Sequence, residues 1–193
     1  MIRLRYGNTN TFYFPGNNGG LLVDTDYAGT LPRFFRAIKA ANIAREDIAW
    51  VLATHYHPDH IGLVGELQAL GATLVIVDAQ LPFVHFADAI FSRDKRLAYK
   101  PVDEGAAKVI SPAGSRDFLR GLGIGGEILL TPSHSADSVS LILDNGDCLA
   151  GDLEPYSYLA GYGENSALER DWENILGRRP RRIFYAHANE TTL

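Results

Sequence analysis

The sequence predicts an α/β fold in which two mixed β-sheets pack face to face, with helices covering their outer surfaces. Short apolar runs typical of strands cluster near both ends and in the middle of the 193-residue chain. Helical patterns lie between these runs but are too few for strict alternation of strand and helix. No repeat, low-complexity tract or linker divides the chain, so we expect a single domain over residues 1–193.

The first half of the chain begins with two β-type runs and the turn sequence Pro-Gly-Asn-Asn-Gly-Gly. A buried strand that ends in Asp24 follows the turn. Thr30 and Pro32 mark the start of a helix that carries Phe34 on one face, and Gly71 marks the end of the next helix. The strands are expected at residues 2–6, 11–14, 21–24, 48–53 and 73–77, and the second helix at residues 61–70.

Residues 79–105 break this order because they are rich in aromatic and charged side chains, and we expect helical excursions over one face of the fold. Regular elements then return. Asn145-Gly146 between two apolar runs is the strongest hairpin signal in the chain. The strands are expected at residues 107–110, 127–131, 138–143, 148–151 and 182–186, and the helices at residues 115–122 and 167–176.

Composition and charge exclude several classes of protein. The net charge of -5 does not favour a nucleic-acid-binding surface. Cys148 is the single cysteine, so no disulfide can form within the chain. No apolar segment typical of a signal peptide follows Arg3 and Arg5, and no apolar run is long enough to span a membrane. We therefore expect a cytoplasmic protein that acts on a small molecule; the oligomeric state stays open.

Half of the six histidines lie in the segment Ala-Thr-His-Tyr-His-Pro-Asp-His-Ile-Gly at residues 53–62, directly after an expected strand. Other potential metal ligands follow three later strands in the same way. The whole set comprises His55, His57, Asp59, His60, His134, Asp152 and His187. Because the ends of strands in register can meet at one edge of a sandwich, we expect these seven side chains to converge.

Imidazole nitrogen and carboxylate oxygen are common ligands of divalent cations. A histidine such as His134 or His187, taken alone, would more often cap a helix or fill a core, but the joint pattern indicates a metal centre. Seven ligands exceed the needs of one tetrahedral ion and suit two ions with an acidified water between them. Zinc is the default for an imidazole-rich site, and iron or manganese also fit a set of histidines and carboxylates.

The pattern His-x-His-x-Asp-His at residues 55–60 resembles the signature of the metallo-β-lactamase superfamily. Further blocks match in the right order: Leu-Val-Asp-Thr at residues 22–25, Thr-Pro-Ser-His-Ser at residues 131–135, Gly-Asp at residues 151–152, and a histidine after the last strand. The resemblance covers nearly the whole chain. It implies an αββα sandwich of two mixed β-sheets flanked by helices, with the metals at one sheet edge.

The resemblance also implies a role for each ligand. His55, His57 and His134 would bind the first metal, Asp59, His60 and His187 would bind the second, and Asp152 would bridge both. Asp24 would hold the metal-binding loop through hydrogen bonds.

The sequence departs from the family pattern at Ser133 and Ala186, which replace glycines and imply a different local backbone. True β-lactamases of the superfamily have another residue in place of Asp152. The chain therefore resembles the glyoxalase II-like and lactonase-like branch, small hydrolases that are not true β-lactamases. Glyoxalase II enzymes carry a C-terminal helical domain, whereas this sequence ends at Leu193, so glutathione thioesters are not the expected substrates.

The function implied is a dinuclear metal-dependent hydrolase that cleaves an ester, thioester or lactone through a metal-bridging hydroxide. Asp59 is the candidate catalytic residue for handling the proton, and residues 79–105 are expected over the active-site face. Tyr156 would donate to the oxyanion or serve in packing, and His85 is expected to be a surface or packing residue. Aromatic candidates for a substrate wall, or for the core, are Phe83, Phe86, Tyr156, Tyr158 and Tyr162.

Three alternatives stay open. A persulfide dioxygenase has a similar motif but holds a single iron with two histidines and an aspartate. A phosphodiesterase or nuclease also belongs to the superfamily, although the acidic charge and short length favour it less. The third alternative is a metal-binding module without catalytic activity.

Overall fold

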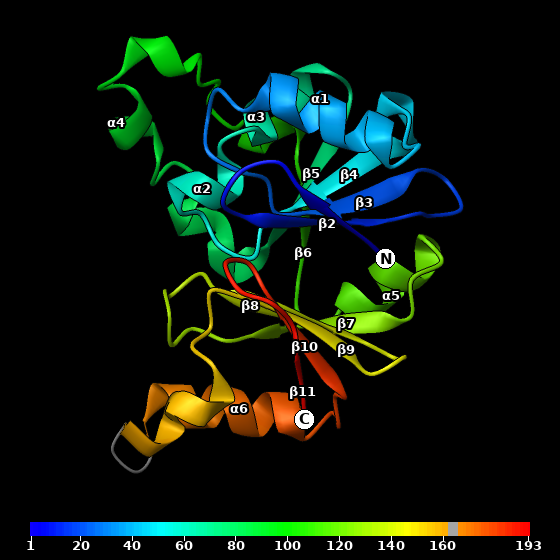
Figure 1. Cartoon of the computed structure of the whole chain (residues 1–193), viewed down its shortest axis with the longest axis vertical. Helices are drawn as coiled ribbons and strands as arrows, with labels where there is room; N and C mark the ends of the chain where they lie inside the picture. Colours follow the sequence, from blue (N-terminus) through cyan, green and yellow to red (C-terminus); the bar gives the residue numbers. More distant parts are fainter. Residues whose placement is uncertain (162–165) are drawn as a thin grey trace.

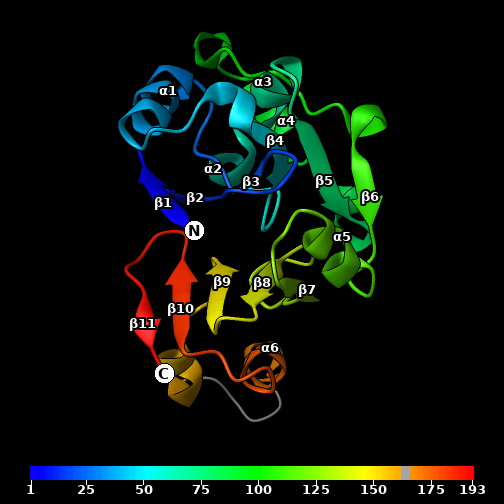
Figure 2. The ribbon, with the colours of Figure 1, turned by 90° about the vertical axis from the view of Figure 1, so that its right-hand side faces the viewer.

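The computed structural model, which describes residues 1–161 and 166–193, contains two β-sheets that pack face to face (Figure 1, Figure 2). The first sheet has the order β1 (Ile2–Arg5), β2 (Asn10–Phe14), β3 (Gly20–Val23), β4 (Ile48–Leu52), β5 (Thr73–Val77), β6 (Lys108–Ile110). The second sheet has the order β11 (Thr191–Thr192), β10 (Arg182–Tyr185), β9 (Asp147–Gly151), β8 (Val139–Leu143), β7 (Gly126–Leu130). Both sheets mix parallel and antiparallel pairs, as predicted.

Helices form the outer layers. α1 (Leu31–Ala40) and α3 (Val64–Ala69) lie outside the first sheet, and α6 (Ala167–Leu176) lies outside the second (Figure 1). α5 (Ser115–Gly121) packs against β7. The arrangement is an αββα sandwich, and it confirms the fold class predicted from the sequence. Within the described residues, no helix has the length and apolar character needed to cross a membrane.

Three apolar cores hold these layers together. A strand that is covered on both faces directs alternate side chains into two different cores. In β3, Val23 faces the core between the sheets, whereas Leu22 faces the core beneath α1. Phe34 and Ile38, four residues apart on α1, fill that outer core. Trp172 of α6 is fully buried in the third core, against the outer face of the second sheet.

One expected helix differs from the structure, and one strand of the structure was not expected. The helix expected at residues 61–70 is divided into α2 (Pro58–Ile61) and α3. Gly62 lies between them, packed so closely on another segment that an added Cβ would lie 2.3 Å from the backbone nitrogen of Ala28. Gly71 ends α3 with φ +103°, as expected. β11 was not predicted from the sequence, since two residues carry no recognisable pattern.

Residues 79–105 contain only short helical pieces. They are the 3₁₀ helix η2 (Asp78–Phe83), α4 (Asp88–Phe91), η3 (Lys95–Leu97) and η4 (Glu104–Ala106). The remaining 3₁₀ helices are η1 (Arg45–Asp47) and η5 (Tyr156–Gly161). Phe91 anchors this segment to the outer core beneath α1.

Candidate metal centre

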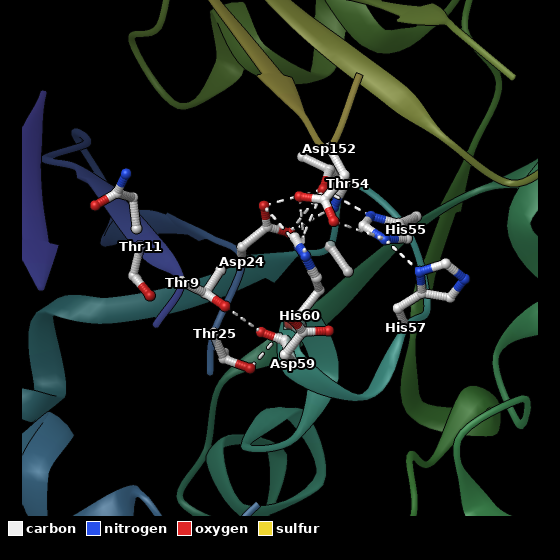
Figure 3. A network of polar contacts seen from close by, with 12 residues as sticks. Thr9, Thr11, Asp24, Thr25, Thr54, His55, His57, Asp59, His60 and Asp152 are labelled. Carbon is white, nitrogen blue, oxygen red and sulfur yellow. Dashed lines mark hydrogen bonds and ion pairs between the residues drawn. The ribbon is translucent and has the colours of Figure 1, made fainter. Parts of the chain in front are cut away.

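The seven potential ligands predicted from the sequence lie together at one edge of the sandwich. The loop after β4 carries the first four, and the chain following β7, β9 and β10 supplies the other three. β9 and β10 are parallel neighbours, so their ends bring Asp152 and His187 to the same edge. Figure 3 shows Asp152 pointing from the second sheet toward His55 and His60 of the β4 loop.

Three imidazoles form the first group. His57 Nδ1 lies 2.9 Å from His55 Nε2 and 3.2 Å from His134 Nε2. Oδ2 of Asp152 faces this group, at 3.9 Å from His55 Nε2 and 3.8 Å from His134 Nε2. Burial and the nearby His60 lower the pKa of His55, so this imidazole is neutral and can offer a lone pair to a cation.

The second group combines two imidazoles with a carboxylate. His187 Nε2 lies 3.2 Å from Asp59 Oδ2 and 3.3 Å from Asp152 Oδ1. The same Oδ1 atom lies 3.4 Å from His60 Nε2. Asp152 therefore presents one oxygen to each group.

The donor set fits a pair of cations. Ligands bound about 2.0 Å from a tetrahedral ion are about 3.3 Å apart, which matches the spacing in both groups. Nε2 of His60 and Oδ1 of Asp152 are buried, and neither atom has a hydrogen-bond partner within residues 1–161 and 166–193. Buried polar atoms normally have a hydrogen-bond partner. These two atoms lie 3.4 Å apart, and an ion bound beside both would supply the missing partner.

Asp24 and Thr54 hold the β4 loop in place (Figure 3). The backbone N–H of Thr54 donates to Asp24 Oδ1 at 2.7 Å, and the Thr54 hydroxyl lies 3.0 Å from Asp24 Oδ2. Asp24 Oδ2 also lies 3.3 Å from His60 Nδ1, which leaves His60 Nε2 directed at the centre. A second partner of this kind fixes the tautomer and orientation of a metal-binding histidine. The expected supporting role of Asp24 matches these contacts.

Gly151 lets the second sheet approach this loop. Its φ is +58°, and an added Cβ would lie 2.7 Å from Thr54 Oγ1. Only glycine combines this backbone conformation with so close a contact. Asp152 is consequently brought against the β4 loop.

Three carboxylates, those of Asp24, Asp59 and Asp152, favour protonated imidazole in the second group. Burial alone would lower the pKa of His60, but Asp24 and Asp152 raise it to about 10. Close contacts with the carboxylates of Asp152 and Asp59 raise the pKa of His187 to about 10 as well. Burial would raise the pKa of Asp152, but its contacts with His187 and His60 hold it well below the usual range. In the second group, protonated imidazoles and ionised carboxylates therefore form ion pairs. A cation bound by the same side chains would replace the protons of the imidazoles.

The Metallo-beta-lactamase superfamily model matches residues 4–187. The chain belongs to this superfamily. It is 26% identical over 187 residues to the Beta-lactamase-like protein 2 homolog of Drosophila melanogaster, covering 94% of this chain and 59% of that relative. The chain thus spans less than two thirds of the length of this curated relative.

Solved structures of the superfamily share the fold. The structure of TTHA1623 in a di-iron-bound form superposes with a TM-score of 0.74 at 23% identity, covering 100% of this chain and 94% of that one. The metallo-beta-lactamase family protein TTHA1429 from Thermus thermophilus gives a TM-score of 0.71 at 17% identity, covering 95% of this chain and 70% of that one. These likenesses establish the αββα architecture.

In this superfamily member, Gln80 is a supporting residue that sequence reasoning missed. Its Nε2 donates to the carbonyl oxygens of Ala53 at 3.0 Å, Thr54 at 3.3 Å and Asp137 at 3.1 Å. The carboxylate of Asp137 in turn accepts a hydrogen bond from the N–H of Tyr56 at 2.7 Å. These contacts join the β4 loop to the loop of the third histidine. The available signal was a polar residue just after the apolar strand β5.

Ser133 and Ala186 occupy the glycine positions of the family pattern without a left-handed backbone. Among the described non-glycine residues, positive φ occurs at Asp24, Asn42, Ala98 and Arg179. The N–H of Ser133 donates to Asp171 Oδ2 at 2.7 Å, and the N–H of Ala186 donates to the Gly151 carbonyl at 2.9 Å. Both residues are therefore accommodated by ordinary hydrogen bonds.

The aromatic candidates differ in position. The ring of Phe86 lies 5.6 Å from that of His57, and the residue is 53% exposed, as expected of a wall beside the centre. Phe83 packs against the core beneath α1, and Tyr156 lies edge-on to Trp172 at 5.6 Å, which favours packing for both. Tyr158 is exposed. The last candidate, Tyr162, lies outside the described residues.

His85, the sixth histidine, lies apart from the centre. It is half exposed, and its Nδ1 lies 2.9 Å from Asp88 Oδ2 within the segment of residues 79–105. This placement agrees with the expected surface role.

Metal affinity is expected to rise with pH between about 6.5 and 10. A cation and a proton compete for the same nitrogen, and the pKa values of His60 and His187 are raised from 6.5 to about 10. Binding at pH 7 should therefore release about two protons, measurable by titration calorimetry in buffers of different ionisation enthalpy. After chelation, these raised pKa values should stabilise the fold below pH 6.5, and this stability should disappear as the pH rises through about 10. Affinity that is independent of pH would contradict the placement of both histidines.

Proposed function

We propose that this chain is a dinuclear metal-dependent hydrolase that acts on an ester, thioester or lactone. One observation carries the proposal: Asp152 directs Oδ2 toward the imidazoles of the first group and Oδ1 toward His60 and His187. A carboxylate shared by two groups of donors suits two ions held close together. A single ion would leave one group without a function.

Six residues would bind one ion each and the seventh would bind both. His55, His57 and His134 would hold the first, Asp59, His60 and His187 the second, and Asp152 would bridge. The pair of ions would supply an acidified water as nucleophile and would polarise the substrate carbonyl. Zinc is the proposed metal. Iron is the main alternative, because TTHA1623 was solved in a di-iron-bound form.

Asp59 is the proposed proton acceptor. Its side chain is 37% exposed, so it reaches the side from which a substrate approaches. The hydrogen bond from His187 lowers the pKa of Asp59, which keeps the carboxylate ionised near neutral pH. An ionised carboxylate at the open side can take a proton from a nucleophile and return it to a leaving group.

Elemental analysis of the native protein, followed by a substrate panel on the enzyme loaded with the matching metal, tests this function. The panel should contain esters, thioesters, lactones and phosphodiesters. About two ions per chain and hydrolysis of a carboxylic ester, thioester or lactone are expected. One iron per chain with oxygen uptake on glutathione persulfide would instead assign the dioxygenase function. Cleavage of phosphodiesters alone would overturn the substrate class, and two bound ions without any turnover would indicate a binding module.

A further inference from the structure

An apolar cavity of about 310 Å³ opens directly onto the metal centre. One wall consists of three proposed ligands, His134, Asp152 and His187. Apolar and aromatic side chains form much of the remainder, among them Leu153, Pro155 and Tyr185. Glu154 also lines this cavity. A substrate held at the centre would extend into this space.

Lysine and arginine are missing from every stretch of sequence that builds the centre and this cavity. Residues 46–92, 121–169 and 183–193 contain neither residue type, and together they include all seven proposed ligands and all cavity-lining residues. Within residues 79–105, Arg93 is the first basic residue, and none of the basic residues of this segment lines the cavity. Apart from the proposed ligands, Glu154 is the charged residue among the described residues that line the cavity.

These walls discriminate between substrates by charge. An anionic group in the cavity would lose water, would meet no lysine or arginine among the described lining residues, and would lie near Glu154, an acidic residue. Phosphate and carboxylate groups are normally bound by arginine, lysine or a row of backbone N–H groups. An aliphatic group would instead gain roughly fourfold in affinity for each methylene removed from water.

We infer that the group of the substrate that fills this cavity is apolar and uncharged. The substrate class is then a neutral aliphatic ester, thioester or lactone. Thioesters that would place a phosphate or carboxylate of their tail in this cavity are excluded. This inference rests on the proposed hydrolase function.

Two esters that differ only at the end of the acyl chain test the inference. The metal-loaded enzyme should hydrolyse 4-nitrophenyl butyrate, which ends in a methyl group, and 4-nitrophenyl hydrogen succinate, which ends in a carboxylate. We expect kcat/KM to be at least about tenfold higher for the butyrate. Equal values, or a preference for the succinate, would overturn the inference.

A charge reversal at the cavity wall sharpens this test. Glu154→Lys should reduce the preference for the butyrate by about tenfold, mainly because the succinate reacts faster. Glu173→Lys is the matched control, since Glu173 is exposed on α6 and does not line the cavity. The control should keep the preference of the unmodified enzyme. An unchanged preference in Glu154→Lys would contradict the assigned position of the substrate.

Binding of uncleaved amides separates this inference from the hydrolase function. Titration calorimetry should show tighter binding of N-(4-nitrophenyl)butanamide than of the corresponding succinic acid amide. If neither ester is hydrolysed but this difference in binding persists, the hydrolase function fails and the charge preference stands. If both esters are hydrolysed and both amides bind equally well, the charge preference fails and the hydrolase function stands.

Discussion

The double replacement His55→Ala with Asp152→Ala is expected to abolish stoichiometric metal binding and to lower kcat/KM by at least about a thousandfold. His55 is completely buried and belongs to the first group of ligands. Asp152 faces both groups, so its loss removes a ligand from each. Metal content by mass spectrometry and the rate on the best substrate of the panel measure the two effects.

His85→Ala is the matched control for this variant. It removes an imidazole that is half exposed and lies outside the centre, so metal content and rate should stay unchanged. Far-ultraviolet circular dichroism should show that both variants are folded. A folded double variant that keeps two ions per chain would refute the ligand assignment.

Trp172→Ala is expected to lower the free energy of unfolding by about 3–5 kcal/mol. The indole is fully buried between α6 and the second sheet, and its Nε1 donates to the Glu154 carbonyl at 2.9 Å. The total stability of a protein of this kind is about 5–15 kcal/mol, so the variant should be close to unfolding. Urea denaturation followed by circular dichroism measures the change.

Trp172→Phe separates packing from hydrogen bonding at this position. Phenylalanine keeps much of the apolar volume but leaves the Glu154 carbonyl without its donor, at an expected cost of about 1–2 kcal/mol beyond the lost volume. The phenylalanine variant should therefore be clearly more stable than the alanine variant. Equal losses for both would show that the third core does not depend on the bulk of this side chain.

The layered fold could be predicted because central strands such as β3, β5 and β8 are buried on both faces and give continuous apolar runs. The division between α2 and α3 could not be predicted in this way. It accompanies the contact of Gly62 with the backbone near Ala28, and that contact is tertiary. A helix pattern read along the chain contains no information on which distant segment will lie against it.

The candidate ligands could be proposed from the sequence because histidines and carboxylates follow four separate strands. Gln80 and Asp137 were not visible, since they act through backbone atoms of other loops. Gln80 donates to carbonyls at Ala53 and Thr54, which lie more than twenty residues earlier in the chain. Beyond the position of a polar residue shortly after β5, the spacing of residue types does not reveal such contacts. Supporting residues of a site are therefore harder to predict than the ligands they support.

Each group of ligands in the centre draws on both sheets. The β4 loop belongs to the first sheet, whereas His134, Asp152 and His187 follow strands of the second. Bound ions would therefore connect two halves that are otherwise held together by apolar contacts and by hydrogen bonds such as those of Gln80 and Asn10. The two halves could then separate only when the ions are released. The ligand atoms would therefore determine the rate of unfolding as well as the catalytic activity.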